Sequence, residues 1–248
     1  MEEITSVNNE LVKETAKLQQ KKYRDATNQF LLEGFKSIEE AVKAGIKIEY
    51  VFVNSRSIQK YNFCNFRIIS TNEAVLKKIT AADSAPEVIA VAKQIHNSID
   101  ALKNASRIIL LEGIKDLGNL GTIIRTASAF GIDGIIMYGD CADLYNPKCV
   151  RSTVGNLWKT PIIEIKDIKI LNKYFKDYDR IATLPLSKNL LKNFKTSEKM
   201  LIMFGSEADG LSKELIDFST SSLKIEMKND VESLNLAVSC AIVMYALM

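Results

Sequence analysis

Polar residues and glycines follow directly after an apolar, strand-like run at residues 107–112. Gly118 and Gly121 permit a tight turn, and the amide of Asn119 can both donate and accept hydrogen bonds there. A strand, a glycine-rich turn and the start of a helix together form a general site for a polar ligand or a phosphate. An ordinary connection between a strand and a helix fits the same residues, so the segment by itself leaves both interpretations open.

The helix after this turn is predicted to open near Thr122 and to carry Arg125 about one turn in. Arginine is rare in the chain, which has 26 Lys but only 7 Arg, so a single Arg at such a place suggests a specific role. The glycine spacing matches neither the G-x-G-x-x-G dinucleotide fingerprint nor the P-loop. Binding of a dinucleotide or of a nucleoside triphosphate therefore loses support.

A second polar segment follows the apolar run at residues 200–205. Its glycines, within residues 205–210, would let a ligand or another part of the chain approach the backbone closely. Glu207 comes directly after a buried strand, where an unpaired carboxylate would be costly, so we expect it to have a partner. The alternative interpretation is that Ser212 simply begins a helix.

A third segment, residues 225–245, has a short strand, a polar turn and an apolar helix. Ser233 suits the N-cap position of that helix. Capping by Ser233 leaves Asn235 unexplained, because Asn235 is a single amide among apolar neighbours. A buried Asn usually has a hydrogen-bonding task, so we expect one here.

In this order and spacing, the patterns NxGxxxRTA, FGSExxGL and IxMxxxVESLNxxVSxAIxxY resemble the SpoU (TrmH-like) branch of the SPOUT-class RNA methyltransferases. The resemblance covers about residues 107–248. It implies transfer of a methyl group from S-adenosylmethionine to a ribose 2′-hydroxyl of RNA. Residues 30–53 look like the small substrate-binding domain of many relatives, which favours rRNA over tRNA as the substrate.

The resemblance also implies a fold and a cofactor site. The expected fold is an α/β fold whose mainly parallel C-terminal sheet contains a deep trefoil knot. Three loops would then hold the cofactor, at residues 182–185, 204–210 and 225–236. The family's usual cofactor contacts carry over to Thr183, Leu184, Gly205, Ile225 and Leu234.

For catalysis, the resemblance points to Arg125, with Asn119, Glu207, Ser233 and Asn235 orienting it and the ribose. The ribose hydroxyl is a weak acid and must lose its proton as it attacks. Arginine is normally protonated, so a role as the base would need a strongly perturbed environment. The favoured role of Arg125 is to position the RNA phosphate and the hydroxyl and to stabilise the developing alkoxide.

Composition supports a globular protein, with 47% hydrophobic and 25% charged residues and a net charge of +3. The cysteine spacing and the lack of a signal-peptide pattern predict that it is cytoplasmic. The four cysteines fit no CxxC metal pattern and are expected to be reduced and buried, and the only histidine, His96, is expected on the surface or in a linker. The N-terminal ten residues do not resemble a signal peptide, and no apolar run could span a membrane. We expect no metal and no membrane partner.

The alternation of strand-like and helical runs predicts a small α/β domain at 1–95, a linker at 96–106 and a second α/β domain at 107–248 with its own core. The resemblance implies that the first domain binds RNA and that the second is catalytic. The polar helix at residues 7–24 is expected to be solvated. Six strands are predicted in the catalytic domain, at residues 107–112, 134–139, 161–165, 180–184, 200–205 and 223–227.

The last helix, residues 234–248, is apolar nearly all round and must be covered on most of its faces. The sheet of its own domain can cover one face. A second copy of the chain would cover another, which predicts a two-fold homodimer, as in the resembled family.

The chain departs from the family pattern at four places, Leu117, Ala208, Glu226 and Asn229, none of which removes a polar group that the family uses. Two other functions stay open at this point. One is a non-catalytic RNA-binding or ribosome-assembly protein of the same fold. The other is a nucleotide-binding enzyme such as a dehydrogenase, which the missing fingerprint weakens.

Overall fold

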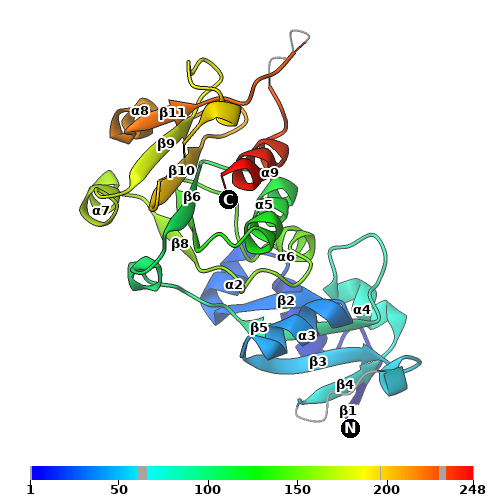
Figure 1. Cartoon of the computed structure of the whole chain (residues 1–248). Helices are drawn as coiled ribbons and strands as arrows, with labels where there is room; N and C mark the ends of the chain where they lie inside the picture. Colours follow the sequence, from blue (N-terminus) through cyan, green and yellow to red (C-terminus); the bar gives the residue numbers. More distant parts are fainter. Residues whose placement is uncertain (1, 61–65, 196, 229–232, 248) are drawn as a thin grey trace. The chain divides into compact units, whose positions relative to one another are not determined.

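The computed structural model describes residues 2–60, 66–195, 197–228 and 233–247. By their contacts, the residues form two compact units (Figure 1). The first comprises Met1–Ile95 and Asp143–Trp158, and the second comprises His96–Ala142 and Lys159–Met248. No helix within the described residues is long and apolar enough to cross a membrane.

The first unit is built on a five-stranded mixed sheet with the order β1-β4-β3-β5-β2. In it, β4 pairs parallel with β1 and β3, while β5 pairs antiparallel with β3 and β2. Its elements are β1 (Glu2–Ile4), α1 (Glu10–Lys17), α2 (Lys21–Thr27), β2 (Gln29–Glu33), α3 (Phe35–Lys43), β3 (Ile48–Asn54), η1 (Ile58–Lys60), β4 (Ile68–Thr71), α4 (Glu73–Ile79) and β5 (Val88–Lys93).

The polar helix expected at residues 7–24 is in fact two helices, α1 and α2. The expectation that it is solvated is wrong for Arg24, whose side chain is only 1% exposed. Its guanidinium donates to the backbone oxygen of Leu18 over 2.7 Å and pairs with the carboxylate of Asp143. These two acceptors compensate for the hydration that the guanidinium loses when it is buried.

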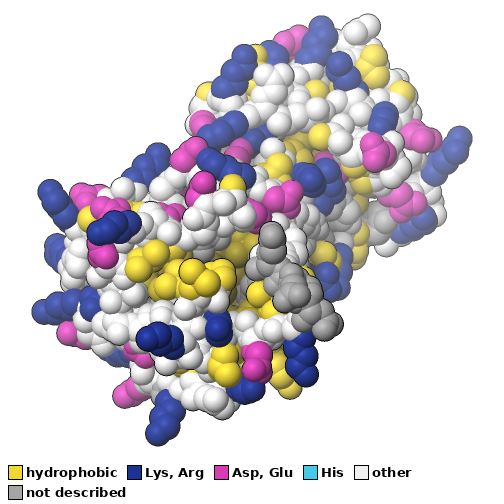
Figure 2. All heavy atoms as spheres, turned by 90° about the horizontal axis from the view of Figure 1, so that it is seen from above, with side chains coloured by type: hydrophobic (Ala, Val, Ile, Leu, Met, Phe, Trp, Pro, Cys, Tyr) yellow, Lys and Arg dark blue, Asp and Glu magenta, His cyan; other side chains and the backbone are white. Residues whose placement is uncertain are grey.

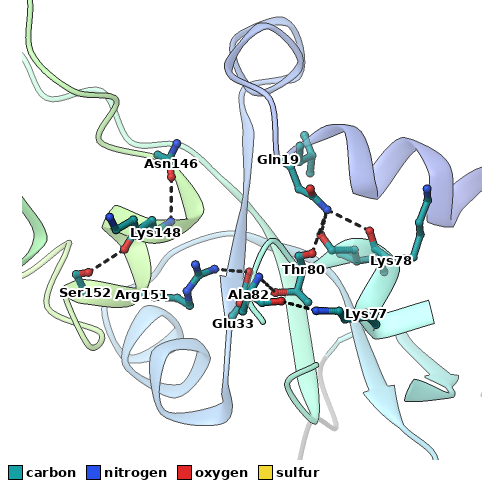
Figure 3. A network of polar contacts seen from close by, with 12 residues as sticks. Gln19, Glu33, Lys77, Lys78, Thr80, Ala82, Asn146, Lys148, Arg151 and Ser152 are labelled. Atoms are coloured by element: carbon teal, nitrogen blue, oxygen red, sulfur yellow. Dashed lines mark hydrogen bonds and ion pairs between the residues drawn. The ribbon is translucent and has the colours of Figure 1, made fainter. Parts of the chain in front are cut away.

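Residues 143–158 come from the connection between two strands of the second unit, and we predicted them to lie in the catalytic domain. The structure corrects this prediction, because their polar contacts lie in the first unit. The Tyr145 hydroxyl accepts from the backbone nitrogen of Ile95 over 2.7 Å and donates to its backbone oxygen over 2.6 Å. From α6 (Pro147–Ser152), Arg151 donates over 3.0 Å to the buried carboxylate of Glu33, which also accepts from the Thr80 hydroxyl (Figure 3).

The second unit is built on a six-stranded sheet with the order β11-β9-β10-β6-β7-β8, in which every neighbouring pair is parallel. The predicted α/β fold with a parallel sheet is therefore confirmed. Its elements are η2 (Ile99–Leu102), β6 (Arg107–Glu112), α5 (Leu117–Ala129), β7 (Gly134–Tyr138), β8 (Ile162–Ile165), α7 (Ile168–Tyr174), β9 (Asp179–Thr183), η3 (Leu191–Asn193), β10 (Met200–Phe204), α8 (Lys213–Phe218), β11 (Ser221–Leu223) and α9 (Leu236–Ala246).

Two predictions need correction in this unit. The last strand ends at Leu223 rather than at residue 227, because Lys224 bonds instead to the backbone of Asn189 and Leu191. The expected linker at 96–106 is also part of the second unit, since Leu102 and Ala105 are buried in its core.

Helices cover both faces of this sheet, with α5 and α9 on one side and α7 and α8 on the other (Figure 1). The strands are buried nearly throughout, as parallel strands between two helical layers are. All the carboxyl ends of the strands lie at one edge, where ligands of such sheets bind.

Candidate active site

A pocket of about 700 Å³ lies at the carboxyl ends of β9, β10 and β11. The residues after these strands are those of the three loops that we expected to hold a cofactor. All five predicted cofactor contacts line the pocket: Thr183, Leu184, Gly205, Ile225 and Leu234. Figure 2 shows hydrophobic side chains gathered on one face of the molecule, with Lys and Arg side chains around them. Residues 229–232, which include the family departure Asn229, lie outside the described residues.

The loop after β10 is closed by its own backbone. Ser206 and Gly210 exchange two backbone hydrogen bonds, of 3.2 and 3.1 Å. A Cβ atom on Gly205 would lie 1.9 Å from the carbonyl carbon of Gly210, which no adjustment of a side chain could relieve. Gly205 is therefore required because another part of the chain approaches it, one of the two possibilities that the sequence left open. Gly210, at φ +68°, adopts the left-handed conformation that glycine favours.

The far end of this loop is held by two strands that the sequence analysis did not connect with it. The backbone nitrogen of Ser212 donates to the Glu112 carboxylate over 2.7 Å, and the Tyr138 hydroxyl donates to Glu214 over 2.6 Å. Burial and the bond to Glu214 raise the pKa of Tyr138 well above its usual range, so Tyr138 remains a donor. Ser212 also caps α8, as the alternative interpretation expected. The only sequence signal for Glu112 and Tyr138 is their place at the ends of strands.

The expected glycine-rich turn before Thr122 is instead the first turns of α5. The helix begins at Leu117 because the Asp116 side chain caps it, accepting from the backbone nitrogen of Asn119 over 2.6 Å. This cap offsets the low helix propensity of the glycines. Asn119 consequently lies in the first turn of α5, and Arg125 lies farther along the helix than predicted.

Three predicted site residues from distant parts of the chain form one hydrogen-bonded chain. The Asn235 amide donates to the Asn119 side-chain oxygen over 3.0 Å, and the Asn119 amide donates to Glu207 Oε1 over 2.6 Å. Glu207 thus has the partner that the sequence analysis expected. Asn235 is exposed rather than buried, and it is Asn235 rather than Ser233 that caps α9, accepting from the Val238 backbone nitrogen over 3.2 Å.

Arg125 and Ser233 are both exposed. Ser233 lines the pocket together with Glu207 and Asn235, whereas Arg125 does not. Within the described part of the chain, Arg125 makes no hydrogen bond or ion pair.

None of the three described cysteines lines the pocket. Cys240 on α9 is buried, and burial together with the charge of Glu207 raises its thiol pKa. Cys149 is buried and Cys141 is half-buried, both with free thiols, while Cys64 lies outside the described residues. No group of three His, Cys, Asp or Glu side chains in the described ranges could hold a metal ion.

Comparison with known proteins shows which family this chain belongs to. Residues 106–245, more than half of the chain, match the model of the SpoU rRNA methylase family. The chain belongs to the SpoU rRNA methylase family. The resemblance found in the three sequence motifs is thereby confirmed. Residues 9–90 match the MRM3-like substrate binding domain, which lies within the first unit.

Similar proteins span nearly the whole chain. A 23S rRNA (guanosine(2553)-2′-O)-methyltransferase, RlmP, of Bacillus subtilis is 29% identical over 100% of this chain and 99% of its own. An uncharacterized tRNA/rRNA methyltransferase of Synechocystis is 30% identical over 98% of this chain and 92% of its own.

Solved structures of the family have the same fold. The AdoMet-bound rRNA methyltransferase from Sinorhizobium meliloti has a TM-score of 0.89 and 28% identity over 99% of this chain and 97% of its own. AviRb of Streptomyces viridochromogenes, a SpoU methyltransferase solved with AdoMet, has a TM-score of 0.87 at 22% identity over 97% of each chain, which supports the fold.

Proposed function

We propose that this protein transfers the methyl group of S-adenosylmethionine to a ribose 2′-hydroxyl of ribosomal RNA. The observation that carries the proposal is the pocket at the carboxyl ends of β9, β10 and β11 in a member of the SpoU rRNA methylase family. The enzyme class and the cofactor that the sequence implied are confirmed by this membership. Membership of a methylase family excludes the alternative of a dehydrogenase. No observation favours a non-catalytic function.

The residues around the pocket suit S-adenosylmethionine. Leu184, Phe204 and Leu234 give it apolar walls, while Glu207 and Asp209 bring negative charge that suits a sulfonium cation. A pocket of this size lies within the range of small-molecule sites. Thr183, Leu184, Gly205, Ile225 and Leu234 would hold the cofactor. When bound, S-adenosylmethionine supplies an electrophilic methyl group.

The site residues would then have separate roles in binding the RNA. Arg125 would bind an RNA phosphate and steady the ribose hydroxyl, since its fork of donors is free for a phosphate. Asn119, Glu207, Ser233 and Asn235 would orient the ribose beside the cofactor. Because Arg125 does not line the pocket of its own chain, a partner subunit's Arg125 is the one that would reach it in a dimer.

A homodimer is part of this proposal, and α9 supports it. Val238, Ile242 and Tyr245 are 48, 37 and 72% exposed and recur at helical spacing, so they form one apolar stripe. The rings of Phe130, at the end of α5, and Tyr245 lie 5.8 Å apart. A second copy of the chain would cover this stripe and bring the two α5 helices together.

The remaining parts of the proposal rest on family membership. The first unit, with its substrate-binding match at residues 9–90, would recognise structured rRNA. The strands β9 to β11 and their loops would form the trefoil knot. The protein would act in the cytoplasm, where ribosomal RNA is made and modified.

Isothermal titration tests the core of the proposal. The protein should bind S-adenosylmethionine and its product S-adenosylhomocysteine, and it should not bind NAD. Binding of NAD alone would overturn the proposal in favour of a dehydrogenase. Absence of binding to all of them would favour a non-catalytic protein.

A further inference from the structure

We propose that Glu207 is the group that accepts the proton of the ribose hydroxyl. This inference rests on the proposed function and adds a catalytic role to it. The family resemblance gave Glu207 only an orienting role and left the base undecided. Three observations carry the assignment: the direction of the hydrogen bonds that reach Glu207, the free oxygen of its carboxylate, and the balance of charge in the reaction.

The hydrogen-bonded chain has a fixed direction. At one end, the backbone nitrogen of Val238 can only donate, so the Asn235 side chain presents its oxygen there and its amino group to Asn119. Asn119 must then accept with its oxygen and donate with its amino group to Glu207 Oε1. The backbone of α9 thus dictates that Glu207 meets a donor and serves as an acceptor.

The other oxygen of the same carboxylate remains available. Within the described residues, Oε2 of Glu207 has no hydrogen bond and no ion pair. Glu207 lines the pocket together with the predicted cofactor contacts Gly205 and Leu234. The bond from Asn119 to Oε1 restricts the rotation of the carboxylate and leaves Oε2 as the acceptor for a substrate.

The charges balance when a carboxylate takes the proton. The 2′-oxygen forms a bond to the methyl carbon, and the bond from carbon to sulfur breaks with its electron pair left on sulfur. The 2′-oxygen loses its proton to Glu207 Oε2. A sulfonium and a carboxylate thereby become a neutral thioether and a neutral carboxylic acid, so the step leaves no unbalanced charge at the site.

A carboxylate is a weak base, but the hydroxyl becomes strongly acidic as its oxygen begins to bind the methyl carbon. The proton can therefore pass late in the step, when a weak acceptor suffices. Arginine would first have to lose its own proton, a form that accounts for only about one molecule in 10⁶ near neutral pH. Arg125 is exposed, and within the described residues it makes no hydrogen bond or ion pair, so its donors are available to an RNA phosphate. Its role is to hold the phosphate.

The decisive variant is Glu207→Gln, which has the same shape and can still accept from Asn119. The control is Asp217→Asn, which removes an exposed carboxylate on α8 that pairs with Lys213. For each protein, affinity for S-adenosylmethionine is measured by titration. Turnover is measured with S-adenosylmethionine labelled in its methyl group and total ribosomal RNA from cells that lack the gene.

We expect Glu207→Gln to bind S-adenosylmethionine within a few-fold of the wild type and to lose turnover by about 100-fold or more. Asp217→Asn should match the wild type in both. A second variant, Glu207→Ala, opens space beside Asn119. Added formate should restore part of its turnover by supplying a carboxylate, and it should leave the turnover of Glu207→Gln unchanged.

Two results would overturn the assignment. One is turnover of Glu207→Gln within about fivefold of the wild type, since a true general base contributes about 100-fold or more. The other is a Glu207→Ala variant that binds S-adenosylmethionine but gains nothing from formate. Failure of the wild type to bind S-adenosylmethionine or to label the RNA would instead overturn the proposed function.

Discussion

Gly205 shows how one residue decides the shape of the pocket. In Gly205→Ala, the new Cβ atom would overlap the carbonyl carbon of Gly210, 1.9 Å away, so the loop would have to open. Overpacking of this kind costs at least about 1–3 kcal/mol, and binding of S-adenosylmethionine should weaken accordingly. Ala208→Gly, at an exposed position of the same loop, is the matched control and should bind normally. Equal affinity of the two variants, by titration, would contradict the proposed position of the cofactor.

Arg125 can be separated from the cofactor site by its own variant. Arg125→Ala should bind S-adenosylmethionine within a few-fold of the wild type, because Arg125 does not line the pocket. Methyl transfer to ribosomal RNA should fall by about 100-fold or more, the scale of a lost transition-state contact. Turnover near that of the wild type would remove Arg125 from the site.

The types of the site residues could be predicted from the sequence, but their partners could not. Glu207 and Asn235 stood out because each is a polar residue beside an apolar run. That Asn119 joins them depends on the order of the strands, which places the starts of α5 and α9 beside the loop after β10. Glu112 and Tyr138 reach that loop because of the same strand order, so their spacing in the sequence does not reveal that they support the loop.

At the scale of elements, Asn235 has two tasks that substitutions can separate. Asn235→Ala removes the cap of α9 and should lower the free energy of unfolding by about 1 kcal/mol in denaturant experiments. Asn235→Asp keeps an oxygen for the Val238 backbone nitrogen but has no amino group for Asn119. Both variants should therefore lose methyl transfer, while only Asn235→Ala loses stability. If Asn235→Asp retained full activity, the hydrogen-bonded chain would have no role in catalysis.

The two faces of α9 predict opposite outcomes for neighbouring substitutions. Ile242 is 37% exposed on the apolar stripe, so Ile242→Glu should shift the protein towards monomers in light scattering without unfolding it. Val243 is fully buried, so Val243→Glu should cause misfolding. A dimer unaffected by Ile242→Glu would show that the stripe is not the subunit interface.

The helix itself could be predicted from its apolar run, yet its exposed side could not. Apolar residues occur nearly all round, so no pattern marks which of them meet the sheet. The structure resolves this through the packing of α9 against α5. Similarly, the glycines near Asn119 suggested a turn because glycine has a low helix propensity. A single side-chain contact, the cap from Asp116, outweighs that propensity, and the sequence pattern does not reveal it.

At the scale of the whole molecule, the structure changes the expectation that the second domain folds by itself. A chain that begins at residue 104 would lose Leu102 from the core of the second unit. It would also keep residues 143–158 without Arg24 and Glu33, their partners in the first unit. Such a chain should unfold several degrees below the full chain in a thermal melt. An unchanged melting temperature would show that these contacts add nothing.

Alternating strands and helices were enough to predict two α/β units and a parallel sheet. They were not enough to assign residues 143–158, whose sequence position lies between β7 and β8. Their assignment depends on contacts such as those of Arg151 and Tyr145, between residues more than 45 positions apart. Periodicity within a short window contains no information about such contacts.

Methylation of ribosomal RNA tests the central claim most directly. Ribose 2′-O-methylation would be mapped along the ribosomal RNA of cells with the gene, without it, and with the gene restored as wild type or as Glu207→Gln. We expect one ribose methyl group to disappear with the gene, to return with the wild type and to stay absent with Glu207→Gln. Ribosomal RNA with the same ribose methylation in all four strains would contradict the claim.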